Sequence, residues 1–515
     1  MTKNYLDILA ETIRNNWDQP ALTDFYLTED GKSQDTSRGN HYTYGEMYEK
    51  IVHVADFLTN LGLQKGDHIA ICGANSAHWV IAYLAIAKMQ GVSVTIMHSL
   101  QPDQIAQLID FSDAKALFVD AELWMELKEK SLPQVKNVIG LEEWGILRGE
   151  KVKIPNRKSQ IENHECGWPV FEPNTLAHIC FTSGTTGKAK GAMLSFENIS
   201  STTWCVKAAY PIRKNKKILS YFPLAHAFGL GLEIVVPLVS GASIFVYRDE
   251  LRIEKIPKAM RIVKPYLAVM VPMMLSKIAE GSILKLLLLR LLGINYIVVG
   301  GAGVPARIGK FMKRMHIPIA PGYGMTETVA LISLITPDTY RVGASGKVCD
   351  ALECRIAPNG EILVKGENVM LGYYKDPEAT AAKIDKDGWL HTGDKGHLDE
   401  DGYLYVEGRL EQDIIVLPNG ENIRPDNIEA FINAMPEVRE SIVLAREGKL
   451  VAIVVPDLKI INLKFEIINI GELRRNILRA INPQLPLFSQ LYDVEITDEP
   501  LQRTEKQTIK RYLYS

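Results

Sequence analysis

The pattern of apolar and polar positions near the start of the chain predicts alternating helices and strands. Residues 43–61 place apolar side chains three or four positions apart, at Met47, Ile51, Val54, Leu58 and Leu61. This spacing puts them on one face of a helix. Thr43-Tyr-Gly-Glu46 is typical of a helix N-terminal cap, in which a hydroxyl accepts a hydrogen bond from the first turn. After Gly62 and Gly66, the short apolar run His68–Cys72 predicts a buried strand.

The same alternation continues to residue 141. Trp79–Met89 is apolar over the length of a helix, and Gly91–Met97 is typical of the next strand. Ala114–Asp120 and Val135–Leu141 follow as further strand-like segments. Strands that alternate with helices indicate a parallel sheet with helices on its faces. We therefore expect a large N-terminal domain of the doubly wound α/β class.

Composition places the chain among soluble globular proteins. Its 515 residues are too many for one ordinary domain, and 47% of them are hydrophobic and 23% charged. The formal net charge of −3 gives no reason to expect a nucleic-acid-binding protein. The N-terminus is polar and lacks the apolar core of a signal peptide. No apolar run reaches the roughly 18 residues that span a bilayer, so a cytoplasmic protein is expected.

Two further features bear on the cellular setting. The six cysteines are Cys72, Cys166, Cys180, Cys205, Cys349 and Cys354. They show no Cys-x-x-Cys spacing and are expected to be reduced thiols. The strongest apolar run is Ile283–Leu292, interrupted by Lys285 and Arg290. It predicts a buried helix, with peripheral contact to a lipid surface as the alternative.

The segment Phe181-Thr-Ser-Gly-Thr-Thr-Gly-Lys-Ala-Lys-Gly191 has the composition of a phosphate-binding loop. Glycines let backbone N–H groups approach an anion closely, and hydroxyl and ammonium groups add further donors. It is not a Walker A loop, because that pattern requires Gly at Thr182 and Ser or Thr at Ala189. The candidate ligands of a polyphosphate are Thr182, Ser183, Gly184, Thr185, Thr186, Gly187, Lys188 and Lys190.

Two glycine-rich segments downstream predict a nucleotide site. Ile297–Gly303 is a strand that runs into a glycine turn, where Gly301 and Ala302 allow close approach of a flat ligand. Pro321-Gly-Tyr-Gly-Met-Thr-Glu-Thr328 holds an aromatic ring between glycines, which suits a purine. Thr326 can hydrogen-bond to phosphate, and Glu327 offers the hard oxygen ligand that Mg²⁺ prefers.

Two more candidate residues follow from local context. Asp394, in Gly388–Gly396, stands alone between glycines and can accept hydrogen bonds from both hydroxyls of a ribose. His226 lies in Pro223-Leu-Ala-His-Ala-Phe-Gly229, where a packed histidine at a strand end is the simpler interpretation.

These motifs and their order resemble the adenylate-forming, AMP-binding superfamily. The block Gly360–Tyr374 is similar to that of its acyl-CoA synthetase branch, the fatty-acid–CoA ligases, and the resemblance extends from about Tyr42 to Arg511. It implies that the loop at 182–190 cradles ATP phosphates and that Gly322–Met325 form the adenine pocket around the Tyr323 ring. The nucleotide ligands it implies are Thr182, Ser183, Gly184, Thr185, Thr186, Gly187, Lys190, Gly301, Ala302, Gly322, Tyr323, Gly324, Met325, Asp394 and Arg409.

The resemblance also implies catalytic and acyl-site roles. Thr326 and Glu327 would act at the phosphates, with Glu327 holding Mg²⁺, and His226 would lie beside the bound carboxylate. The segment Leu267–Leu275 would line the acyl tunnel. The family pattern has Pro where this chain has Ala189, which affects the stiffness of the loop more than its chemistry.

A hinge and a small mobile C-terminal α+β domain are implied beyond residue 410. The implied division is 1–410, a hinge at 411–413, and 414–515, with Gly420 near the CoA channel. Alignment from Ile414–Ile423 makes Asp413 the hinge residue, whereas alignment from Arg409 makes it Gln412, and we favour Asp413.

The tail Pro500–Arg511 resembles the motif that carries the catalytic lysine, although a direct register puts Thr508 at that position. Lys506 and Lys510 flank it by two residues, and Lys506 is the preferred candidate.

The implied reaction is ATP-dependent adenylation of a carboxylic acid followed by transfer to the thiol of CoA. A fatty acid is the expected substrate. The open alternatives are transfer to an acyl carrier protein, an oxidative luciferase reaction, and a nucleotide-binding regulator that has lost adenylation. The implied small molecules are ATP, Mg²⁺ and CoA.

Overall fold

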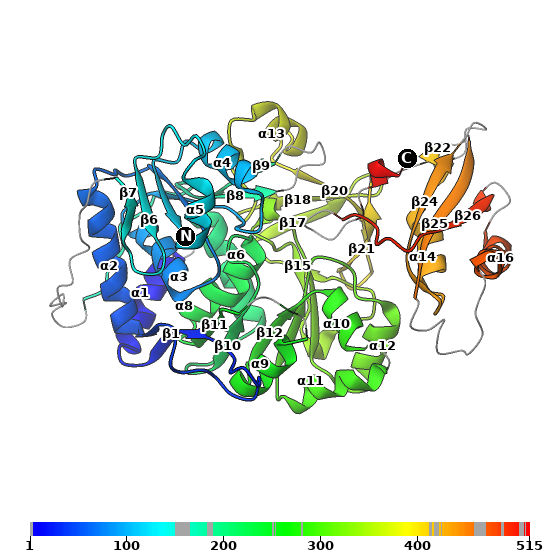
Figure 1. Cartoon of the computed structure of the whole chain (residues 1–515), viewed down its shortest axis with the longest axis horizontal. Helices are drawn as coiled ribbons and strands as arrows, with labels where there is room; N and C mark the ends of the chain where they lie inside the picture. The colour runs from blue at the N-terminus through cyan, green and yellow to red at the C-terminus, as the bar shows by residue number, and fades with distance from the viewer. Residues whose placement is uncertain are drawn as a thin grey trace. The chain divides into compact units, whose positions relative to one another are not determined.

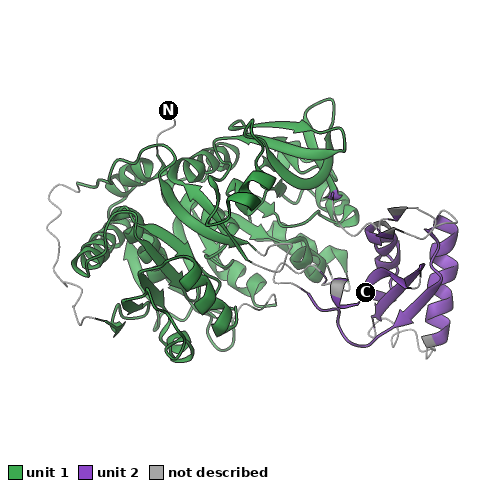
Figure 2. Ribbon diagram, turned by 90° about the horizontal axis from the view of Figure 1, so that it is seen from above, with its two compact units in different colours: residues 1–407 green, residues 408–515 purple. Residues whose placement is uncertain are grey.

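The structure is a computed structural model that describes most of the chain in two compact units. The described residues are 4–149, 165–182, 189–249, 252, 254–279, 282–410, 415–416, 422–423, 425–446, 448–457, 470–485, 489–503, 509 and 511–514. The first unit comprises residues 1–407 and the second residues 408–515 (Figure 2). Each unit is treated by itself below.

One sheet of the first unit has a parallel centre with antiparallel edges. Within the described residues its strand order is β19-β9-β8-β4-β3-β5-β6-β7. Figure 1 labels β6, β7, β8 and β9 of this sheet. The strands are β3 (His68–Cys72), β4 (Val92–Thr95), β5 (Ala116–Val119), β6 (Asn137–Gly140), β7 (Ile146–Arg148), β8 (Leu176–Thr182), β9 (Lys190–Ser195) and β19 (Gly372–Tyr373). The strands from β8 to β6 in this order pair in parallel, which confirms the predicted doubly wound α/β architecture.

The second sheet changes from parallel to antiparallel at β14 (Ile319–Tyr323). Its described order is β17-β18-β20-β21-β16-β15-β14-β13-β12-β10-β11-β1-β2. The parallel part adds β1 (Pro20–Phe25), β10 (Lys217–Ser220), β11 (Ser243–Tyr247), β12 (Leu267–Met270) and β13 (Tyr296–Val299), with β2 (His41–Thr43) antiparallel at its edge. The antiparallel part adds β15 (Ser333–Leu334), β16 (Gly346–Val348), β17 (Leu352–Ile356), β18 (Glu361–Gly366), β20 (Leu390–Leu398) and β21 (Tyr403–Arg409).

The helices predicted from periodicity form where expected. Helix α2 (Tyr44–Asn60) begins at a complete capping box, in which Thr43 and Glu46 exchange side-chain and backbone hydrogen bonds. Helix α3 (Ala77–Lys88) is buried at eleven consecutive residues from Ala77 to Ala87, because it packs inside the unit rather than along its surface. The N-terminal helix α1 (Tyr5–Asn15) packs against α2, α6 (Phe196–Ala209) and α8 (Val236–Val239).

Further short helices complete the first unit. They are α4 (Pro102–Phe111), α5 (Ala121–Leu127), α7 (Ala227–Gly229), the π-helix η2 (Leu230–Val235), α9 (Ile256–Val263), α10 (Pro272–Ile278), α12 (Ala306–Arg314) and α13 (Pro377–Lys383).

The apolar run at 283–292 forms a 3-10 turn, η3 (Ile283–Leu286), followed by helix α11 (Leu287–Leu291). The prediction of a buried helix is wrong for one side of this segment, which is exposed to solvent. Leu286 and Leu289 are buried, but Leu284, Leu288 and Leu291 are 60, 51 and 79% exposed. The segment is too short to be enclosed, so one side of it faces solvent.

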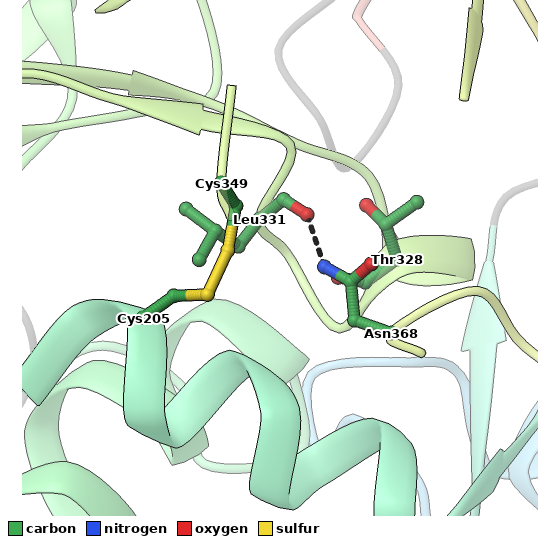
Figure 3. Close-up of a disulfide and its surroundings, with 5 residues drawn as sticks. All are labelled: Cys205, Thr328, Leu331, Cys349 and Asn368. Atoms are coloured by element: carbon green, nitrogen blue, oxygen red, sulfur yellow. Dashed lines mark hydrogen bonds between the residues drawn. A yellow bond between two sulfur atoms is a disulfide. The ribbon is translucent and has the colours of Figure 1, made fainter. Parts of the chain in front are cut away.

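The prediction that all six cysteines are reduced is also wrong. Cys205 on α6 forms a disulfide with Cys349, which follows β16, although 144 positions separate them in the sequence (Figure 3). Spacing along the chain could not reveal this pair, because the fold brings their Cα atoms within 6.1 Å. Cys72, Cys166, Cys180 and Cys354 are free thiols.

The second unit is the α+β domain expected from the sequence. Strands β24 (Val438–Arg446), β25 (Lys449–Pro456) and β26 (Asp493–Ile496) form a sheet, and a short pair joins β22 (Ile415–Val416) to β23 (Asn422–Ile423). Helices α14 (Pro425–Asn433) and α16 (Ile470–Ile481) belong to the same unit. Leu473, Ile477 and Ile481 of α16 are buried in a core with Val443, Ala452 and Val454.

Within the described segments of both units, we find no helix with the length and apolar character needed to cross a membrane.

Candidate functional site

The predicted phosphate loop connects two paired strands. Strands β8 and β9 are antiparallel, and Thr182 lies opposite Lys190 at the open end of the ladder. The predicted ligands Ser183, Gly184, Thr185, Thr186 and Gly187, together with Lys188, lie outside the described residues. The described flanks therefore fix where the loop leaves and re-enters the sheet.

Tyr323 and Asp394 are neighbours, as the predicted adenine and ribose positions require. The Tyr323 hydroxyl at the end of β14 donates a hydrogen bond of 2.5 Å to Oδ2 of Asp394 on β20. Asp394 is 7% exposed. A side chain at Gly324 would place its Cβ 2.3 Å from the carbonyl of Ala330, so glycine is required beside this tyrosine. The ring is thus held at a fixed position.

Glu327 is connected to Lys190 through a residue to which the sequence analysis gave no role. The Tyr373 hydroxyl on β19 donates a hydrogen bond of 2.6 Å to Oε1 of Glu327. The ammonium group of Lys190 lies 5.2 Å from the centroid of the Tyr373 ring, at cation–π distance. The two predicted phosphate-site residues therefore meet at Tyr373, because β19 pairs with β9.

The backbone immediately after Glu327 is strained. Val329 and Ala330 have φ of 50° and 62°, in the left-handed region that β-branched residues rarely adopt. The amide nitrogen of Asn368 donates hydrogen bonds to the carbonyls of Thr328 (3.2 Å) and Leu331 (2.7 Å), on either side of this pair (Figure 3). Asn368 is fully buried, so it acts as a clamp on the strained turn.

A second buried amide holds Asn368 in place. The Nδ2 atom of Asn198 on α6 donates hydrogen bonds to the carbonyls of Glu367 (2.7 Å) and Val369 (2.9 Å), which bracket Asn368. The same helix carries Cys205, whose disulfide partner Cys349 donates its N–H to the carbonyl of Ile332. Helix α6 is therefore attached to the segment around Glu327 by two independent routes.

His226 caps helix α7, and its Nδ1 accepts a 3.2 Å hydrogen bond from the N–H of Phe228. The Phe228 ring lies where a side chain at Gly300 would be, with a closest distance of 2.7 Å to the position of that Cβ. Gly301 follows with φ of 85°, which glycine adopts without strain.

Glu233 supports the segment that leads to His226. It is fully buried in the π-helix η2, and its Oε2 accepts the N–H groups of Tyr221 and Phe222 at 2.9 Å each. Burial raises the pKa of Glu233 to about 8.

Five other predicted site residues are not placed near Tyr323 and Glu327 by the described structure, whereas Gly322, Met325 and Thr326 are. Arg409 ends β21 and belongs to the second unit. Asp413, Gly420, Lys506 and Lys510 lie outside the described residues. Gly322 and Thr326 are described beside Tyr323 and Glu327, and Thr326 is buried. Met325 accepts N–H bonds from Thr328 and Ala330 at its carbonyl, which closes the turn.

Sequence reasoning gave no role to Tyr373, Asn368, Asn198 and Glu233. Tyr373 and Asn368 fall inside the block at 360–374 that carried the family resemblance, and this is the signal that could have drawn attention to them. Asn198 lies within a helical segment, and nothing in its local pattern distinguishes it from a surface residue. Glu233 is the one charged residue in the apolar run Leu230–Val239, and this is the signal that could have drawn attention to it.

Comparison with known families agrees with this geometry. The AMP-binding enzyme family matches residues 9–374, and its C-terminal domain family matches residues 412–514. The chain belongs to the AMP-binding enzyme family, and the predictions of an adenylate-forming enzyme and of an AMP-forming acid–thiol ligase are confirmed.

The chain is similar to several curated CoA ligases of different specificity. It is 29% identical over 432 residues to 2-succinylbenzoate–CoA ligase of Oceanobacillus iheyensis, covering 81% of this chain and 83% of the relative. It is 26% identical over 454 residues to the long-chain-fatty-acid–CoA ligase FadD15 of Mycobacterium bovis, covering 78% and 75%. The acid therefore differs among these relatives.

Solved structures share the fold at low identity. ATP-bound MatB from Rhodopseudomonas palustris superimposes with a TM-score of 0.79 at 24% identity, covering 99% of this chain and 98% of that one. The o-succinylbenzoate CoA synthetase MenE from Bacillus subtilis, in complex with AMP, gives 0.76 at 23% identity, covering 99% and 97%. These likenesses confirm the two-domain fold.

Proposed function

We propose that this acid–thiol ligase activates a carboxylic acid with a largely apolar acyl group and transfers it to CoA. The observation that carries the proposal is the convergence of Tyr323 with Asp394, and of Lys190 with Glu327, within the first unit. These contacts support a nucleotide site in which Tyr323 offers an aromatic face, Asp394 an acceptor for ribose hydroxyls, Lys190 a cation and Glu327 a carboxylate.

An apolar acid is supported by the segment predicted to line the acyl tunnel. Met270, Met274 and Leu275 are buried and belong to one apolar cluster. Among curated relatives, both FadD15 and the ACSBG1 proteins are long-chain-fatty-acid–CoA ligases. The 2-succinylbenzoate ligase is named for a more polar acid. The experiment below therefore compares acids of different classes.

Each predicted residue has a role in the proposed nucleotide complex. The Tyr323 ring would lie against adenine, and Asp394 would accept the ribose hydroxyls. The loop between Thr182 and Lys190 would bind the β- and γ-phosphates, where backbone N–H groups and cations stabilise the charge. Arg409 would also contact the nucleotide. Gly301 and Ala302 would allow close approach of the ligand.

Glu327 fits the magnesium site that the family implies. Its carboxylate is 7% exposed and is oriented by Tyr373, which leaves a hard oxygen donor in a fixed place. The described residues contain no group of three His, Cys, Asp or Glu able to hold a metal by themselves. This agrees with Mg²⁺, which one or two carboxylates hold together with substrate phosphates. When bound, the ion would neutralise phosphate charge.

The first half-reaction joins the carboxylate to AMP. A carboxylate oxygen attacks the α-phosphorus, the bond from that phosphorus to the bridging oxygen breaks, and pyrophosphate leaves. The chain positions the reactants and neutralises charge, which is the main contribution of a protein to phosphoryl transfer. His226 would lie beside the acid. Lys506 would contact both the acid and the α-phosphate.

The second half-reaction forms the thioester. The CoA thiol loses its proton, its sulfur attacks the acyl carbonyl carbon, and AMP leaves with the bonding electrons. The C-terminal domain would turn at Asp413, replacing Lys506 by a thiol channel near Gly420. Such a domain movement can limit turnover.

The test is pyrophosphate release with Mg-ATP across straight-chain and aromatic carboxylates, with and without CoA. We expect multiple turnovers only with CoA, and a preference for one class of apolar acid. A single-turnover burst that CoA leaves unchanged would indicate a carrier-protein acceptor. No release with any acid, while ATP still binds, would instead support a nucleotide-binding regulator.

A further inference from the structure

The segment η3–α11 presents a row of apolar side chains to solvent. Leu284 lies in the 3-10 turn, and Leu288 and Leu291 are three positions apart on α11, which places them on one face of that helix. Their exposed fractions are 60, 51 and 79%, and Met273 on the neighbouring helix α10 is 47% exposed. We call these four residues the leucine surface. Exposed apolar side chains gathered in this way are uncommon unless they meet a partner.

The three leucines of this surface lie in a part of the sequence that has cationic but no acidic residues. From Ser282 to Thr326 the sequence contains no Asp or Glu. Its six cationic residues are exposed, and they are Lys285, Arg290, Arg307, Lys310, Lys313 and Arg314. The net positive charge of this segment therefore comes from its lack of acidic residues.

The cations at the end of α12 lie beside the leucine surface. Segment η3 contacts α10, α11 and α12, and these three helices lie together in Figure 1. The guanidinium of Arg290 on α11 donates a 2.8 Å hydrogen bond to the carbonyl of Met315, the residue that caps α12. Lys313 and Arg314 occupy the last turn of that helix. Aliphatic and cationic side chains thus share one region of the first unit.

We propose that the leucine surface docks on an anionic lipid bilayer. Leucines inserted at the boundary between headgroups and acyl chains, with Lys and Arg at the headgroup phosphates, are the two elements of interfacial binding. A nucleic-acid site would combine cations with aromatic side chains that stack on bases. The leucine surface combines them with leucines, which favours lipid.

The position of this surface also suits the proposed substrate. Leu286 and Leu289, on the buried side of the same segment, belong to the apolar cluster that contains Met270 and Met274. A membrane-dissolved acid would arrive next to the segment predicted to line the acyl tunnel. This link rests on the proposed apolar substrate, whereas the docking itself does not.

The experiment is sedimentation of the full-length protein with vesicles of phosphatidylglycerol and phosphatidylcholine, or of phosphatidylcholine alone. We expect binding to the anionic vesicles, weakened at high salt because exposed charges are screened. The double variant Leu288→Ser/Leu291→Ser should lower the partition coefficient at least tenfold, and so should Lys313→Glu/Arg314→Glu. The control for the leucine variant is Met125→Ser/Val170→Ser, which replaces exposed apolar residues elsewhere. The control for the charge variant is Lys65→Glu/Lys386→Glu, which replaces exposed lysines elsewhere.

The outcomes separate docking from folding and from the enzymatic proposal. Thermal unfolding followed by circular dichroism should give the same melting temperature for all variants, which shows that they fold. Binding that the test variants retain, or that the controls lose equally, overturns the proposal. A wild-type protein that binds neither kind of vesicle also overturns it, and so does a wild-type protein found to be a dimer that dissociates when the leucines are replaced. A failed acid panel with intact vesicle binding would overturn the enzymatic proposal alone.

Discussion

At the scale of single residues, two buried amides determine the backbone path that follows Glu327. The side chain of Asn198 donates hydrogen bonds to the carbonyls on either side of residue 368. The side chain of Asn368 does the same on either side of the left-handed pair Val329–Ala330. A strained turn persists only where its surroundings hold it. The carboxylate of Glu327 therefore depends on hydrogen bonds made by residues that need not touch the nucleotide.

Asn368→Asp should uncouple this support. The carboxylate has no amide donors, so the carbonyls of Thr328 and Leu331 lose their buried hydrogen bonds, at a cost of about 1–3 kcal/mol each. We expect kcat/KM for ATP in pyrophosphate release to fall at least about tenfold, together with a lower melting temperature. Asn359→Asp, at an exposed turn, is the matched control. Unchanged ATP kinetics in a destabilised variant would limit Asn368 to a role in stability.

Glu233 gives a prediction about pH. Its pKa is about 8 in the folded protein, against about 4.5 for an unperturbed group, so the folded state keeps a proton that the unfolded state has lost. The contribution of Glu233 to the free energy of unfolding is therefore largest below about pH 4.5. It decreases by about 1.4 kcal/mol per pH unit as pH rises, until about pH 8.

Glu233→Gln removes this titration and keeps an oxygen for the N–H groups of Tyr221 and Phe222. The melting temperature of the variant minus that of the wild type should increase steadily from about pH 5 to about pH 8. Thermal unfolding followed by circular dichroism measures it. A difference that does not vary with pH would show that Glu233 is ionised throughout.

At the scale of elements, the Cys205–Cys349 disulfide joins α6 to the sheet that contains β14, the strand of Tyr323. Cross-linking residues 144 positions apart removes conformational freedom from the unfolded chain, and native disulfides typically contribute about 2–4 kcal/mol. Cys205→Ser/Cys349→Ser should melt several degrees below the wild type, and reduction should lower the wild type to the same value. Cys166→Ser provides the control. Identical melting of reduced and oxidised wild type would contradict the prediction.

Elements with a strong local pattern could be predicted from the sequence. Helix α2 was recognisable because its periodicity and its Thr43 cap are local, and β3 because its apolar run is bounded by glycines. The glycine motifs around Tyr323 were recognisable for the same reason. The Cys205–Cys349 pair and the hydrogen bond from Tyr373 to Glu327 were not, since both join segments that meet only in the folded sheets. The exposure of Leu291 likewise depends on what packs beside it.

At the scale of the whole molecule, the proposed hinge can be tested with a matched pair of substitutions. Proline fixes φ and removes an N–H, so it should restrict rotation at the pivot. Asp413→Pro should preserve pyrophosphate release in a single turnover and abolish thioester formation, whereas Gln412→Pro should affect both much less. Acyl-CoA formation measured by chromatography separates the two steps. The reverse result would select the alignment from Arg409, and equal loss of both half-reactions would place the hinge elsewhere.

The N-terminal segment of the first unit is completed by residues synthesised much later. Thr12 donates a hydrogen bond to the carbonyl of Val239, 227 positions further on, and the N–H of Leu27 donates to Asp249 across 222 positions. At the usual ribosomal rate of about 5–20 residues per second, these partners emerge roughly 10–45 s after the segment itself. During that interval α1 lacks its contacts with α6 and α8, and one edge of β1 lacks its partner strand β11. The nascent chain should therefore be most dependent on chaperones before residue 250 leaves the ribosome.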